Sequence, residues 1–162
     1  MKDELKKKLE AEFERRNKQQ ETIRQRALEA KKEAEEFILK FMDLRDNVIA
    51  PAMREIGEFI KEKGFNYRID VEDEKLPTAA DQTHKYPSIT FYYFKGDRMS
   101  APKDTLHVSF SCVKSSNKVR IFQSNMTAGG GVSGPKGDLS ISKINADLVQ
   151  NYIGDLIAGK IF

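Results

Sequence analysis

Apolar residues in the first third of the chain recur with alternating spacings of four and three. The eight positions of this seam are Ile23, Ala27, Ala30, Ala34, Phe37, Phe41, Leu44 and Val48. Such spacing is the heptad pattern of a helix that packs along one side, and it runs through sequence that is otherwise almost wholly charged. A helix this polar buries too little surface to be stable alone, so we expect the seam to face a partner helix or a folded domain.

The same segment predicts one long helix over residues 3–50, because no glycine or proline occurs before Pro51. Small alanines in the middle of the seam allow a partner helix to approach closely, whereas Phe37 and Phe41 make its end wider and more apolar. We therefore expect the helix to leave an oligomeric stem and to reach the globular part of the chain around Phe37. Two, three or four chains, parallel or antiparallel, are all compatible with this seam.

The remaining sequence predicts a small domain that mixes helices and strands. Pro51 is expected to kink or break the long helix, and a second helix follows over residues 52–63. Beyond Gly64 the spacing of apolar residues changes to two, which predicts strands. The expected strands lie at 67–72, 88–94, 105–113, 118–126 and 139–142, and a last helix is expected over 146–158.

This order of elements predicts an α+β fold. A long coiled-coil-like helix at the N-terminus precedes an antiparallel sheet of four to five strands that carries helices on one face. The expected division is residues 1–50 for the heptad-patterned helix and residues 51–162 for the α+β domain.

The composition of the chain says more about the cellular compartment of the protein than about its function. The chain has 162 residues, of which 33% are charged, and its formal net charge of +3 does not by itself demand nucleic acid. Cys112 is the only cysteine, which favours a reducing, cytoplasmic compartment and rules out a disulfide within one chain. No apolar run approaches the roughly 20 residues that span a bilayer, so we expect no membrane association.

The glycine-rich segment at residues 128–137 resembles a phosphate-binding loop only superficially. Such a loop needs a helix directly after it and a Ser or Thr after its lysine, whereas Gly137 follows Lys136 and a strand is expected next. We interpret the segment as a flexible hairpin connection. A mobile loop that closes over a partner stays open as an alternative.

Neither catalytic nor metal-binding chemistry has a recognisable pattern. The only histidines are His84 and His107, and His107 and Cys112 are five residues apart on a strand, so they face opposite sides. Cys112 alternates with apolar residues and is expected to be an inert core thiol. We therefore expect no enzyme activity, no metal and no cofactor.

One face of the predicted sheet combines aromatic and basic residues. If Phe91 and Tyr93 point inward, the opposite face carries Tyr92, Phe94, His107, Arg120 and Phe122. Aromatic and basic side chains on an open sheet can stack bases and hold phosphates. The alternative, which we favour here, is that the long helix or a second subunit covers this face.

The leading hypothesis is a non-enzymatic scaffold protein. It would assemble with copies of itself through the seam and display the α+β domain to another macromolecule, most plausibly a protein. The second hypothesis is single-stranded nucleic-acid binding through the aromatic and basic sheet face.

Overall fold

The computed structural model describes residues 2–113 and 115–160. The α-helices are α1 (Asp3–Leu44), α2 (Ala50–Glu62) and α3 (Ala146–Ile157). The strands are β1 (Asn66–Glu72), β2 (Ser88–Phe94), β3 (Leu106–Val113), β4 (Lys118–Ser124) and β5 (Ser133–Leu139). A π-helical turn joins α1 to α2 at Arg45–Ile49, and short 3-10 helices occur at Pro102–Asp104 and Ile141–Lys143.

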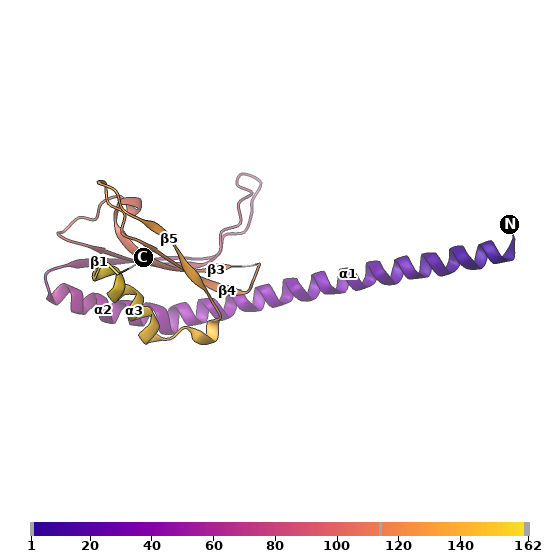
Figure 1. Ribbon diagram of the computed structural model, residues 1–162, viewed down its shortest axis with the longest axis horizontal. Helices are drawn as coiled ribbons and strands as arrows, with labels where there is room; N and C mark the ends of the chain where they lie inside the picture. The colour runs from indigo at the N-terminus through magenta and orange to yellow at the C-terminus, as the bar shows by residue number, and fades with distance from the viewer. Residues whose placement is uncertain (1, 114, 161–162) are drawn as a thin grey trace. The chain divides into compact units, whose positions relative to one another are not determined.

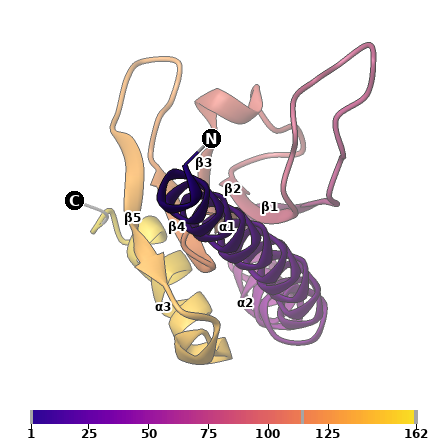
Figure 2. The same cartoon turned by 90° about the vertical axis from the view of Figure 1, so that its right-hand side faces the viewer.

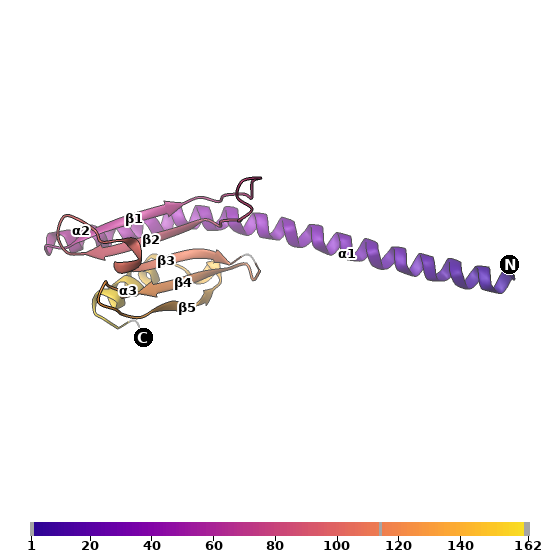
Figure 3. The same ribbon diagram turned by 90° about the horizontal axis from the view of Figure 1, so that it is seen from above.

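The five strands form one antiparallel sheet in the order β1-β2-β3-β4-β5, which Figure 3 shows from above. Helices α2 and α3 both lie on the same face of this sheet (Figures 1 and 2). The predicted α+β class, with a long N-terminal helix and helices on one sheet face, is confirmed.

The hydrophobic core lies between the sheet and its helices. Inward-facing positions of the central strands are fully buried, among them Phe91, Phe110 and Ile121. They pack with Met53 of α2 and Ile153 of α3. The expected alternation of inner and outer residues is therefore present along β2, β3 and β4.

Two compact units make up the chain, Met1–Glu36 and Phe37–Phe162. The second unit begins within α1 rather than after Pro51, because Phe37, Ile38 and Phe41 are buried members of its core. In the first unit the helix is almost wholly exposed. Its best-formed ion pairs join Glu12 to Arg15 and Arg16, at 2.7 and 3.0 Å.

Pro51 does not break the helix, which was one of the two outcomes predicted for it, a kink or a break. The backbone stays helical from α1 into α2, and the π-helical turn ends at Ile49, two residues before the proline. In this wider turn the amide of Ala50 donates to the carbonyl of Arg45, five residues back. Pro51 then lies in the first turn of α2, where its missing amide costs least.

The glycine-rich segment also differs from expectation. Strand β5 occupies Ser133–Leu139 instead of residues 139–142, so most of the segment's second half is strand. Because β5 is an edge strand, Pro135 is tolerated in it, opposite Phe122 and beside an irregularity at which the register with β4 passes over Lys136 of β5. Residues 125–132 form the hairpin connection, closed by backbone hydrogen bonds between Thr127 and Gly130.

Candidate binding surfaces

The predicted seam divides into an exposed part and a part used within the chain. Phe37 and Phe41 belong to the core of the second unit, Ala34 is buried, and Leu44 and Val48 are partly buried. Ile23, Ala27 and Ala30 are exposed. The C-terminal part of the seam therefore stabilises this chain's own fold and is not free for another helix.

The register continues toward the N-terminus through Phe13 and Leu9, but the polar residues Arg16 and Gln20 occupy the two seam positions between Phe13 and Ile23. Ile23 is 66% exposed, Phe13 57% and Leu9 40%. We name Leu9, Phe13, Ile23, Ala27 and Ala30 the exposed stripe. Apolar side chains at helical spacing that stay in water are a characteristic of surfaces that pair with another molecule.

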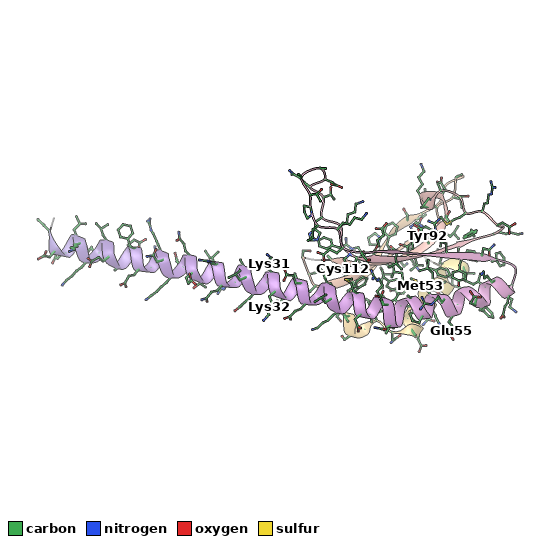
Figure 4. The ribbon with its side chains drawn as sticks, turned by 180° about the vertical axis from the view of Figure 1, so that it is seen from behind. Lys31, Lys32, Met53, Glu55, Tyr92 and Cys112 are labelled. Atoms are coloured by element: carbon green, nitrogen blue, oxygen red, sulfur yellow. The ribbon has the colours of Figure 1, made fainter. Side chains whose placement is uncertain are left out.

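The sheet face opposite α2 and α3 is the outer face. Figure 4 shows Tyr92 on this face and Met53 on the other, between the sheet and α2. The helical residues from Phe37 onward pack into the core on the inner side. The expectation that the long helix covers the outer face is therefore wrong for this part of the helix, which the inner face needs for its own burial.

Strand pairing brings three of the predicted outer-face residues together. Tyr92 lies opposite His107, and their ring centroids are 5.3 Å apart. The His107 ring stacks on Phe122 of β4, with centroids 5.9 Å apart and planes 17° from parallel. Tyr92, His107 and Phe122 thus form an aromatic row across three strands.

Tyr92 is the support of this row rather than its exposed platform. It is only 9% exposed, and burial raises the pKa of its hydroxyl. The Arg68 guanidinium lies over its ring at 5.1 Å from the centroid and also pairs with Asp70. His107 and Phe122 are more accessible, so they offer the stacking surface.

Phe94 and Arg120 share the outer face without joining the row. Arg120 forms a bidentate pair with Asp138 of β5, with nitrogen–oxygen distances of 2.9 and 3.1 Å. This pairing holds the pKa of Asp138 below its ordinary value, so the carboxylate stays charged at neutral pH. Arg120 is thereby partly neutralised, and Phe94 lies near the end of β2 opposite Asn66.

Beside the aromatic row lies a pocket of about 430 Å³, which we call the outer pocket. Its lining residues are Tyr92, Pro102, Lys103, His107, Phe122, Ser124, Met126 and Ser133. Sequence reasoning missed Lys103 and Ser133. Neither lies in a segment whose spacing marks the outer face, although Pro102 signals a turn that could carry a functional side chain.

The wall of the outer pocket is held by local hydrogen bonds. Thr105 is buried, and its hydroxyl lies 3.0 and 3.2 Å from the carbonyl oxygens of Ala101 and Ser100. The Nδ1 of His107 is 2.8 Å from the carbonyl oxygen of Thr105, so Nδ1 carries the proton. In the neutral ring, Nε2 is therefore the acceptor.

The other titratable candidates have structural roles. His84 pairs with Glu74 at 2.7 Å, in the connection between β1 and β2. Burial raises the pKa of the Cys112 thiol to about 12, assisted by the negative charge of Glu74, so little reactive thiolate exists at neutral pH. Within residues 2–113 and 115–160, no group of three His, Cys, Asp or Glu side chains could hold a metal ion.

A search among the described helices finds none that is both long and apolar enough to cross a membrane. Comparison of the chain with protein-family models, with curated proteins and with solved structures finds no match.

Proposed function

We propose that the protein is a non-enzymatic assembly protein of the cytoplasm that associates with copies of itself through the exposed stripe. The observation that carries this proposal is the exposure of Ile23 and Phe13, at 66% and 57%, in heptad register on a highly charged helix. Pairing of such helices buries these side chains and offsets the cost of holding a long polar helix ordered.

The alanines of the stripe support close pairing. Ala27 and Ala30 have only a methyl group, so two helix backbones can approach without large side chains between them. Each chain would then contribute one α+β unit to the assembly. That unit presents the outer face to a further macromolecule, for which another protein is our first candidate.

The test is the double variant Ile23→Asp with Ala30→Asp. Two carboxylates in the seam repel each other and cannot be buried cheaply, so we expect the oligomer to dissociate to a monomer. The mass of the full-length chain is measured by light scattering on a sizing column. Phe37 and Phe41 are left unchanged, because both are core residues.

Leu28→Asp is the matched control for this experiment. Leu28 is 59% exposed and lies next to Ala27, but outside the heptad register. It should keep the mass of the unmodified protein. A monomeric unmodified chain, or an equal loss of mass in both variants, would refute assembly through the stripe.

The second candidate function is single-stranded nucleic-acid binding at the outer face. The aromatic row favours it, because His107 and Phe122 present nearly parallel rings on a sheet face that α2 and α3 leave open. The segment from Lys85 to Lys143 contains nine basic residues and three acidic ones, so it adds positive charge. Arg68 and Arg120 are paired with carboxylates, so stacking is expected to contribute more than charge.

Fluorescence anisotropy with a labelled single-stranded oligonucleotide tests this candidate. Phe122→Leu keeps an apolar side chain but removes the ring, and a lost base stack of about 1 kcal/mol corresponds to roughly fivefold weaker binding. Phe59→Leu, a change of a 57% exposed phenylalanine on the helical side, is the control and should have no effect. Absence of oligonucleotide binding at low ionic strength, where the phosphate contacts are strongest, would exclude this function.

A further inference from the structure

We propose that the outer pocket is a subsite for one nucleotide, with the base against His107 and Phe122 and the phosphate at Lys103. This inference rests on the second candidate function, binding of single-stranded nucleic acid. It adds a defined position on the outer face and residues that the aromatic row does not include.

The size and the lining of the pocket fit a planar, polar ligand. Its volume of about 430 Å³ lies within the range of about 300–1,000 Å³ that small-molecule sites occupy. One wall is the stacked pair of His107 and Phe122, and Met126 extends the apolar surface. Flat apolar walls of this kind bind a nucleobase through its face and tolerate any base.

The polar groups are placed around this wall. The hydroxyl of Ser124 accepts a hydrogen bond from the amide of Met126 at 3.2 Å, which leaves its own proton to donate. Ser133 lies opposite Ser124 on β5 and is exposed. The Nδ1 of His107 donates to the carbonyl oxygen of Thr105, so Nε2 is the ring nitrogen left to bond a ligand.

Lys103 supplies the cation. It is exposed in the 3-10 helix Pro102–Asp104, and among the described residues its ammonium group has no ion pair with a carboxylate. Asp104 follows it in sequence but does not line the pocket. On the outer face, Arg68 and Arg120 are paired and Lys118 lies at the far end of β4. Lys103 lines the pocket itself and is therefore the cation best placed to bind a phosphate there.

Hydrogen bonds hold the backbone turn that carries Lys103. The buried hydroxyl of Thr105 is bonded back to the turn that carries Lys103, and the carbonyl of Thr105 fixes His107. The His107 ring and the backbone turn that carries Lys103 are thus both bonded to Thr105, whereas the exposed Lys103 side chain is left to reach the ligand. Preorganisation of this kind lowers the entropic cost of binding.

The experiment titrates the full-length chain with adenosine 5′-monophosphate, adenosine and inorganic phosphate, with binding followed by calorimetry. We expect the nucleotide to bind and both part-ligands to bind at least tenfold more weakly. The variant Lys103→Ala should weaken nucleotide binding on the order of tenfold, to the level of adenosine, since one charge-assisted contact is lost. Phe122→Leu should weaken nucleotide and adenosine alike.

Lys118→Ala is the matched control, because Lys118 is an exposed lysine on the same face at the far end of β4. It should leave nucleotide affinity unchanged. The site would be refuted if Lys118→Ala and Lys103→Ala lowered nucleotide affinity equally. It would also be refuted if inorganic phosphate bound as tightly as the nucleotide does. Oligonucleotide binding that adenosine 5′-monophosphate does not compete with would overturn the subsite alone. If neither the oligonucleotide nor adenosine 5′-monophosphate binds, the nucleic-acid function is refuted together with the subsite.

Discussion

Gly57 lies where α2 comes closest to β1. A methyl group at this position would meet the ring of Tyr67 at 2.5 Å, much nearer than any real contact allows. The Tyr67 ring is also held on its other side, stacked on Phe91 at a centroid distance of 5.5 Å. Its hydroxyl donates to Glu58 at 2.6 Å. The ring therefore has little freedom to move away from a larger residue.

We expect Gly57→Ala to lower the free energy of unfolding by about 1–3 kcal/mol, because overpacking outweighs the gain in helix propensity. Gly154→Ala in α3 is the comparison, since nothing lies within 4 Å of its added methyl group. That variant should be stabilised by about 0.5–1 kcal/mol. Urea unfolding measures both, and a stabilised Gly57→Ala chain would show that Tyr67 moves aside easily.

At the scale of elements, Arg45 in the π-helical turn joins the helices to the connection between β1 and β2. Its side chain is only 4% exposed, and it bonds to the carbonyl of Glu72 at 3.1 Å and to Asp73 at 2.9 Å. Asp46 accepts a further bond at 2.8 Å. Beyond this anchor, the amides of Lys75 and Lys85 each donate to the other's carbonyl.

Removal of this anchor should loosen residues 73–87. We expect Arg45→Ala to cost about 1–3 kcal/mol, since a buried charged donor and its contacts are lost. The amides of Lys75 and Lys85 should then exchange their hydrogens faster, as hydrogen-exchange measurements would report. Arg54→Ala, a change of an exposed arginine in α2, should do neither. Unchanged exchange at Lys75 would mean that the connection holds itself together.

An alternating pattern of apolar and polar residues predicts some strands of the sheet and not others. Apolar and polar residues alternate along β3, whereas β2 ends in four consecutive aromatic residues, so the sequence placed Tyr92, His107 and Phe122 on one face only on the condition that Phe91 points inward. The structure meets this condition, because Phe91 is fully buried. Strand β5 has almost no apolar residues in Ser133–Leu139, and backbone pairing with β4 defines it instead. That pairing is independent of side-chain pattern, which explains why this strand was predicted in the wrong place.

For the whole molecule, the two compact units predict two separable behaviours. A chain shortened to residues 33–162 keeps the second unit and one preceding helical turn, so it should unfold cooperatively at a midpoint independent of protein concentration. In the full-length chain, helix loss from the first unit should shift with concentration, because association stabilises it. Circular dichroism at several concentrations measures both, and a shortened chain that does not fold would contradict the division.

The seam shows why a periodic pattern has two possible meanings. Eight positions with one spacing predict a single apolar surface, and no property of the spacing distinguishes a partner helix from the chain's own sheet. In the structure Phe37 and Phe41 are core residues, while Ile23 is exposed. The large aromatic residues Phe37 and Phe41 fill the space against the sheet, whereas Ala27 and Ala30 stay exposed.

The sequence by itself determined the α+β class, the long helix, the faces of the central strands and the buried position of Cys112. These follow from local periodicity, which depends only on neighbouring residues. Tertiary structure decided which part of the seam stays exposed, how Pro51 is accommodated, and that Lys103 and Ser133 meet the aromatic row at one pocket. The physical reason is that these outcomes depend on contacts between residues far apart in sequence, which no local pattern encodes.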